Sequence, residues 1–381
     1  MKSDRGGRTR PPETSTTPPD SDKATAARAR RAKATTTSRT PPDRLALPVE
    51  EAARIIALGY LDDANQAGAR LADPTDIEAL HDFRVAIRRL RSGLRAYRQF
   101  LKGSVPKKSR NELRELAAAT GTGRDTEVQL EWLRKQKLAP SQRIGQVWLI
   151  ARLEERKQGA YDEIRKRVST EFPGVEKRLA KRLRVYRVKI DRDAAGAGRL
   201  DFARASADLL DTFAVELRTH LDGVHSSDDE EEAHRARISA KRLRYLLEPL
   251  KGELAGCPAV ISRIKLLQEL LGDLHDAAVH GAELRPSVEA AAAERAGHIH
   301  DLTLAAPPTT PRPRNKAADD TSPGLLALAR KVRQRRESRF SELEAAWLSG
   351  RADSFFGALH KLSERLAVSG SGGSGGPSGN R

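Results

Sequence analysis

The chain has 381 residues, among them 69 Lys or Arg and 52 Asp or Glu, and its formal net charge is +17. Such an excess of cations indicates affinity for a polyanion: nucleic acid, an anionic membrane or polymeric phosphate. The single cysteine, Cys257, excludes an intramolecular disulfide and a thiolate-rich metal site. Because no secretory signal and no apolar run of roughly eighteen residues stand in the sequence, we expect a cytoplasmic protein without membrane segments.

Both ends of the chain have compositions that predict disorder. Residues 1–44 are rich in Pro, Thr, Ser, Ala, Lys and Arg, have almost no large apolar side chains, and carry a net charge of +6. Residues 369–381 are rich in Gly and Ser. We therefore expect the folded domain to span residues 45–368, and it keeps a positive net charge without the tails.

Between the tails the sequence predicts one helix after another. Apolar residues recur three and four positions apart, and neither strand-type alternation nor a hairpin signal interrupts them. A Pro- and Asp-containing stretch, 305–323, predicts a loop. The fold class is therefore predicted to be all-α. The predicted helices cover residues 53–71, 80–101, 113–119, 144–168, 175–190, 202–221, 238–250, 260–271, 325–348 and 355–366.

Two parts of the chain match each other. HDFRVAIRRLR from His81 and HRARISAKRLR from His234 share a His, an Arg three positions later, a basic pair, a Leu and an Arg. A second pair of matching segments, 116–128 and 267–279, follows at nearly the same distance in each half. We infer a duplicated helical-bundle unit whose two bundles are related by a pseudo-two-fold axis. The two repeats span about residues 48–194 and 200–366.

The repeated segment places its cations along one side of a helix, beside an apolar stripe that includes Phe83, Leu90 and Leu94. The first basic stripe consists of His81, Arg84, Arg88, Arg91, Arg95, Arg98 and Lys102. The second basic stripe consists of His234, Arg237, Lys241, Arg244 and Lys251, and Glu248 interrupts it. Stacked like charges destabilise a helix by a few tenths of a kcal/mol per pair, so an anionic ligand is indicated. One guanidinium group can bind two phosphate oxygens at a time. The stripe is about 30 Å long, and this length suits a polymer better than a single phosphate.

Each of these features also has a structural interpretation. A charged helix face is often only solvated, and a histidine at a helix start, such as His81 or His234, is often a packing residue. The pairs Arg124–Asp125 and His275–Asp276 are either ion pairs or helix-start caps, or their Asp orients the neighbouring basic group for a functional role. A metal bound by the two histidines is the weaker interpretation. Since P-loop, HExxH and GxSxG motifs are absent, we expect neither catalytic residues nor a cofactor or metal.

The double motif resembles the CHAD family, the conserved histidine α-helical domains, over about residues 48–366. The resemblance implies two helical bundles around a basic central groove, binding of inorganic polyphosphate and, in some members, association with polyphosphate granules. It adds Arg89, Arg242 and Tyr245 to the binding residues, although helical geometry turns the two arginines away. It also adds Arg124 and His275, the latter as a weaker ligand at neutral pH. The full candidate set is His81, Arg84, Arg88, Arg89, Arg91, Arg95, Arg98, Lys102, Arg124, His234, Arg237, Lys241, Arg242, Arg244, Tyr245, Lys251 and His275.

Two other functions remain open at this point. The basic N-terminal tail, with the stripes, would suit non-specific binding of nucleic acid, but no recognised nucleic-acid-binding motif is present. An enzyme of phosphate metabolism would need acidic metal ligands facing the stripes. The Glu-x-Glu-x-Lys strand of the triphosphate-tunnel domain, which many relatives carry, is absent, and this removes the usual reason to expect hydrolysis. The oligomeric state is not fixed by the sequence.

Overall fold

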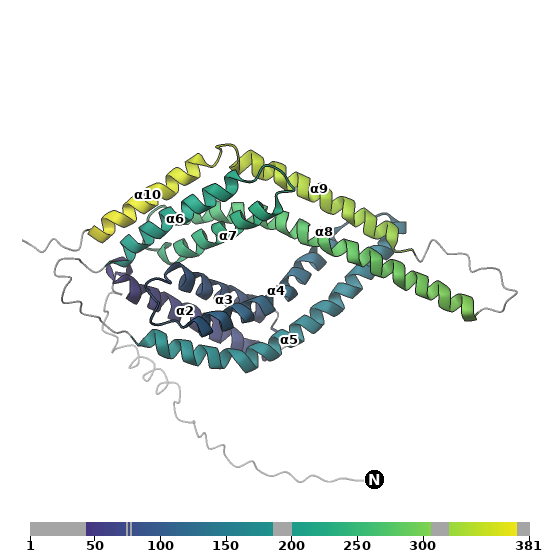
Figure 1. The fold of residues 1–381 in the computed structure, drawn as a ribbon, viewed down its shortest axis with the longest axis horizontal. Helices are drawn as coiled ribbons and strands as arrows, with labels where there is room; N and C mark the ends of the chain where they lie inside the picture. The colour runs from purple at the N-terminus through teal and green to yellow at the C-terminus, as the bar shows by residue number, and fades with distance from the viewer. Residues whose placement is uncertain (1–42, 74, 77, 186–199, 306–319, 372–381) are drawn as a thin grey trace, which may run out of the picture. The chain divides into compact units, whose positions relative to one another are not determined.

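The computed structural model describes residues 43–73, 75–76, 78–185, 200–305 and 320–371, and Figure 1 traces them by colour. Within these residues the regular elements are helices, apart from one backbone bridge between Pro48 and Asp201. The predicted all-α class is therefore confirmed. The elements are η1 (Arg44–Ala46), α2 (Val49–Arg70), α3 (Ala79–Ala96), α4 (Lys107–Lys135), η2 (Pro140–Gln142), α5 (Arg143–Arg184), α6 (Phe202–Asp222), α7 (Glu230–Leu247), η3 (Glu248–Leu250), α8 (Cys257–Ala305), α9 (Ser322–Trp347) and α10 (Asp353–Ser371).

The predicted tails lie mostly outside the described residues, where their predicted disorder stays a prediction. The predicted limits of the folded domain, 45 and 368, are slightly too narrow, because η1 begins at Arg44 and α10 extends to Ser371. The same holds for most of the predicted loop 305–323, although Ala305 still belongs to α8 and α9 begins at Ser322. None of the described helices combines the length and the apolar character that crossing a bilayer requires.

Several predicted helix boundaries are wrong. The segments 144–168 and 175–190 form one helix, α5, which continues through Pro173 to Arg184. Its packing against both α4 and α2 offsets the hydrogen bond that the proline removes. The predicted helix 80–101 ends at Ala96, because the backbone leaves the helical conformation at Tyr97. The Tyr97 ring is buried in the core, where its hydroxyl lies 2.9 Å from the Ser206 hydroxyl.

The two halves of the chain pack their helices in the same order. In the first half α2 packs on α3 and α4 on α5, and in the second half α6 packs on α7 and α8 on α9. Contacts between the halves join α2 to α6, α3 to α7, α4 to α8 and α5 to α9. A two-fold relation between duplicated units would give this pairing, and the pseudo-two-fold axis itself stays a prediction.

A hydrophobic core shared by the two halves fixes the basic stripes of α3 and α7. The apolar stripe predicted beside the cations is buried on both helices. Near their N-termini, α5 and α9 pack together where Gly145 meets Gly324. A Cβ on either glycine would collide with the backbone of the other segment. The buried stripe residues are Phe83, Leu90, Leu94 and Leu101 in the first half and Leu243, Leu247 and Leu250 in the second.

Candidate functional site

The basic stripes of the two halves meet where α3 packs against α7. The guanidinium carbon of Arg88 on α3 lies 5.7 Å from the ring centroid of Tyr245 on α7, and that of Arg244 lies 4.8 Å from it. Arg244 also donates a hydrogen bond of 2.9 Å to the Tyr245 hydroxyl. Tyr245 is buried, so one aromatic ring with its electron-rich faces offsets part of the repulsion between guanidinium groups from opposite halves.

A hollow of about 730 Å³ opens at this contact, between α3, α4, α6 and α7. Eight cations line it, and among its lining residues Glu216 alone is acidic. The cations are Arg88, Arg91, Arg95, Arg98, Arg110, Arg114, Lys241 and Arg242. Sequence reasoning missed Arg110 and Arg114, which lie on α4 outside the repeated motif. Their spacing of four positions, which puts both on one side of a helix, was the available signal.

Many cations of the stripes lack an acidic partner. In the described part of the chain, no carboxylate oxygen lies within 4.0 Å of the side-chain nitrogens of Arg88, Arg91, Arg95, Arg237 or Lys241. Burial and neighbouring cations lower the pKa of each of the four guanidinium groups. Burial lowers the pKa of Lys241 to about 7, helped by Arg237, Arg88 and Arg244. The hollow therefore concentrates positive charge at a cost that an anion would offset.

Other members of the candidate set already have carboxylate partners. Arg89 donates to Glu248 at 2.9 Å, and the Nε atom of Arg244 lies 3.3 Å from the same carboxylate. Glu248, which interrupts the second stripe, thus joins one cation of each half. Arg242 donates to Glu216 at 2.8 Å. These three arginines are held in place by ion pairs, and a ligand would have to compete for them.

Arg84 belongs to a cluster of charged side chains around Glu127 of α4. Arg84 and Arg124 each lie 3.5 Å from this carboxylate, and Lys157 lies 3.9 Å from it. The Tyr161 hydroxyl donates to it as well, and burial with this bond raises the pKa of Tyr161 to about 12. Arg84 Nη1 is buried and makes no hydrogen bond to a described residue.

The pairs Arg124–Asp125 and His275–Asp276 lie inside α4 and α8, so the alternative that they cap helix starts is wrong. Desolvation raises the pKa of both carboxyls, and Arg237 of α7 opposes the shift in each. Arg237 therefore interacts electrostatically with acidic groups from both halves. Within the described residues, no three of His, Cys, Asp and Glu are placed to share a metal ion.

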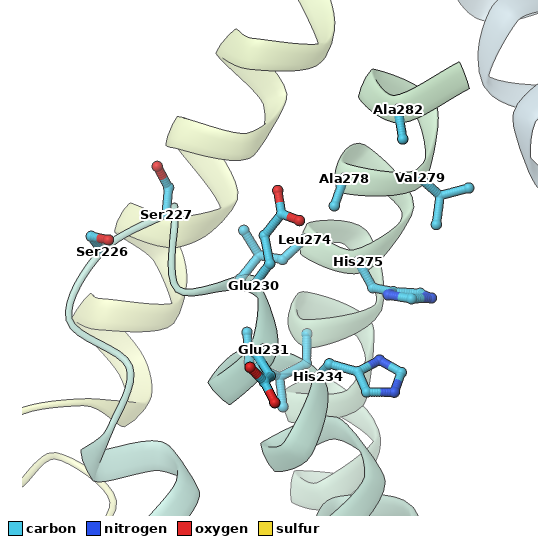
Figure 2. Close-up of a pocket in the computed structure, with 12 residues that line it drawn as sticks. Ser226, Ser227, Glu230, Glu231, His234, Leu274, His275, Ala278, Val279 and Ala282 are labelled. Atoms are coloured by element: carbon cyan, nitrogen blue, oxygen red, sulfur yellow. The ribbon is translucent and has the colours of Figure 1, made fainter. Parts of the chain in front are cut away.

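His234 and His275, the two candidate histidines of the second half, lie together beside a mostly apolar hollow of about 430 Å³ (Figure 2). The ring centroids of His234 and His275 are 5.0 Å apart, and both rings point to the same side in Figure 2. Burial, Arg237, His234 and Lys241 lower the pKa of His275 to about 4, so it is neutral at neutral pH. His81, the counterpart of His234 in the repeat, is instead exposed at the first turn of α3.

Three predicted residues lie beyond the helices that were expected to carry them. Arg98 and Lys102 follow the end of α3, and Lys251 follows η3 and is exposed. The straight stripe of 30 Å is therefore wrong: from His81 to Arg95 the helix rises about 21 Å. Arg98 still borders the hollow, whereas Lys102 and Lys251 do not.

The fold and this geometry define an all-helical protein whose two halves bring basic helices together. A family model described as CHAD domain matches residues 56–285, which is more than half of the chain. The chain therefore belongs to the CHAD domain family, and the resemblance seen in the sequence is confirmed.

A solved structure shares the fold at low sequence identity. The crystal structure of the CHAD domain from the plant Ricinus communis is 21% identical, with a TM-score of 0.54, and the match covers 83% of this chain and 93% of that one. PptA from Streptomyces chartreusis is 16% identical with a TM-score of 0.49, over 79% of this chain and 100% of that one. No curated protein matches the chain.

Proposed function

We propose that this protein binds inorganic polyphosphate in the hollow between α3 and α7, without catalysing a reaction on it. The observation that carries the proposal is the group of half-buried cations from both halves that have no carboxylate within 4.0 Å among the described residues. Partial burial of such cations is unfavourable unless an anion compensates. Arginine-rich walls suit phosphate oxygens because each guanidinium group offers paired donors.

A polymer fits the site better than a single phosphate. The cations line a hollow of about 730 Å³ and come from α3, α4 and α7, so one small anion could contact only some of them. Membership of the CHAD family supports polyphosphate as the polymer. A bound chain longer than the hollow would extend beyond it, which is what association with cytoplasmic polyphosphate granules requires.

The hollow also favours polyphosphate over nucleic acid. Tyr245 is buried, and the guanidinium groups of Arg88 and Arg244 already lie over its ring, so it offers little surface to a base. Sequence-tolerant nucleic-acid binding usually needs such stacking surfaces beside the cations. The N-terminal tail, for which nucleic-acid binding was considered, lies outside the described residues.

Binding without catalysis follows from the scarcity of free acidic groups in the hollow. Its one lining carboxylate, Glu216, is engaged by Arg242. Metal-assisted phosphate chemistry needs carboxylates that can hold Mg²⁺ and position a nucleophile. The proposal therefore assigns the hollow to retention of the polymer.

The test is competition between long-chain polyphosphate and duplex DNA for the full-length protein at near-physiological salt. The variant Arg88→Gln/Lys241→Gln removes two unpaired cations from the hollow. The matched control, Lys166→Gln/Lys177→Gln, removes two exposed lysines of α5 that border none of the hollows described here. We expect the wild type and the control to prefer polyphosphate and the hollow variant to lose that preference. Equal binding of both polymers, or a hollow variant that behaves like the control, would contradict the proposal.

A further inference from the structure

Two cations that were predicted to lie on α3, but that follow its end, indicate a second part of the binding surface. Arg98 and Lys102, which follow the end of α3, line a hollow of about 520 Å³ that is bordered by α6 on its other side. This second hollow shares Arg95 and Arg98 with the hollow at the α3–α7 contact. The two hollows are therefore neighbours, and the positive lining continues from one into the other.

A third hollow, of about 910 Å³, adjoins the second. It shares Phe100 and Lys102 with the second hollow, and its far wall is the C-terminal part of α5. The cations of that wall are Arg178, Lys181 and Arg182. The three hollows thus form a basic path that leaves α3 where this helix ends and reaches the end of α5.

A buried arginine of α2 holds the parts of this path together. Arg54 donates hydrogen bonds to the backbone carbonyls of Arg182, at 3.0 Å, and Leu183, at 3.2 Å. It also bonds to the Ser104 hydroxyl, in the segment after α3, and pairs with Glu50 at 2.7 Å. Because one side chain ties the last turn of α5 to the segment after α3, the third hollow is a fixed feature of the fold.

Cations at the end of a helix have an ordinary explanation, since they interact favourably with the helix dipole. The pairing of the acidic residues goes beyond that explanation. Each hollow has one acidic lining residue, and each of these already has an arginine partner. The pairs are Glu216 with Arg242 at 2.8 Å, Asp208 with Arg204 at 3.4 Å, and Glu50 with Arg54 at 2.7 Å.

The cations of the path are left available by this arrangement. In the described part of the chain, Arg98, Lys102, Lys181 and Arg182 have no carboxylate within 4.0 Å of their side-chain nitrogens. Arg178 differs, because it pairs with Glu112 at 2.9 Å. An uninterrupted positive lining with its few acids neutralised is what a linear polyanion requires along its length.

We infer that a long polyphosphate chain leaves the α3–α7 hollow past Arg98 and Lys102 and binds to Lys181 and Arg182 at the end of α5. This inference rests on the proposed function and adds a path for the polymer and a dependence on its length. A short polyphosphate fills the first hollow alone, whereas a long chain also gains the contacts on α5.

The test compares tripolyphosphate with long-chain polyphosphate on the full-length protein. The variant Lys181→Gln/Arg182→Gln keeps the backbone carbonyl that Arg54 needs, and Lys166→Gln/Lys177→Gln on the same helix is the matched control. We expect the path variant to bind the long chain roughly tenfold more weakly. The slope of log K against the logarithm of the salt concentration should become shallower by about 1 to 2. Affinity for tripolyphosphate stays unchanged in both variants, and melting temperatures verify that both variants fold.

The outcomes separate the two proposals. If Arg88→Gln/Lys241→Gln weakens binding of both polymers and Lys181→Gln/Arg182→Gln weakens neither, the path is wrong and the proposed function stands. An equal loss for tripolyphosphate and the long chain in the path variant also overturns the path, because it would reflect general electrostatics. If Arg88→Gln/Lys241→Gln weakens neither, the proposed function itself fails.

Discussion

Helices α3 and α9 are both rich in arginine, but their surroundings use the charge differently. On α9 these cations form ion pairs: Arg335 and Arg339 pair with Asp273 of α8 at 2.7 and 2.8 Å. Arg336 pairs with Asp228 at 2.5 Å. On α3, Arg88, Arg91 and Arg95 face α7 and α4 with no carboxylate within 4.0 Å among the described residues. A comparable run of arginines thus forms ion pairs with neighbouring elements on α9, whereas on α3 it leaves the contact positively charged.

The difference teaches that the pairing of charges marks a binding site more reliably than their number. Ion pairs near a surface contribute little stability each, so those of α9 chiefly fix how it sits against α8 and α7. The unpaired cations of α3 and α7 weaken the fold unless an anion joins them. Changes to the unpaired cations of the site should therefore alter ligand affinity, whereas equivalent changes on α9 should not.

The largest expected effect is on affinity when two charges are removed from each region in turn. Charge-assisted contacts contribute about 1.5–3 kcal/mol each, so Arg88→Gln/Lys241→Gln should weaken polyphosphate binding by at least about a hundredfold. Removing two paired arginines, in Arg333→Gln/Arg336→Gln, should change the affinity less than about twofold, because their charge is already neutralised by Glu337 and Asp228. Titration calorimetry at one salt concentration measures both. Similar losses in the two variants would mean that net charge alone drives binding.

The next effect is a dependence of affinity on pH. Burial and Arg237, Arg88 and Arg244 lower the pKa of Lys241 to about 7, so the unliganded protein loses this charge as the pH rises from 6 to 8. Affinity for polyphosphate should fall by up to about tenfold over that range, with proton uptake on binding above pH 7. In Lys241→Arg the decrease should vanish, since a guanidinium group stays charged.

His275, which lies near Lys241, does not imitate this behaviour. The pKa of His275 is lowered to about 4, so this group titrates below the range in question. Affinities measured from pH 6 to 8.5 in wild type and Lys241→Arg isolate the lysine. A decrease of the same size in both proteins would assign it to another group.

The sequence predicted the helices, the buried stripe and the basic stripes, because periodicity along the chain determines all three. It could not predict which cations are paired. Arg89 meets Glu248 across 159 positions, and Arg242 meets Glu216 on a neighbouring helix. The end of α3 was missed for a similar reason, since Tyr97 is drawn into a core that the second half completes. Arg110 and Arg114 enter the hollow only because α4 folds back along α3.

A smaller effect should follow from removing the acid that joins the halves. Glu248 pairs with Arg89 of the first half and Arg244 of the second. In Glu248→Gln both guanidinium groups become available, so affinity for polyphosphate should rise about threefold while the melting temperature of the free protein falls. Asp273→Gln, which removes the acid shared by Arg335 and Arg339, should lower the melting temperature without raising affinity. Weaker polyphosphate binding in Glu248→Gln would show that Glu248 positions its arginines for the ligand.

The smallest effect is on stability, and its sign differs between the two regions. Because the folded-state pKa of Lys241 lies near 7, below its unfolded value of about 10.4, the unfolded chain binds the proton more tightly. The charged lysine therefore destabilises the fold, and stability of the wild type rises from pH 7 towards pH 10. Lys241→Met should raise the melting temperature at pH 6 to 7 by roughly 2–4 °C, and this gain should shrink as the pH approaches 10. Arg336→Gln on α9, which loses two ion pairs, should instead lower it slightly at every pH in this range. Thermal unfolding without ligand measures both, and a lower melting temperature for Lys241→Met would mean that this lysine serves the fold and not the ligand.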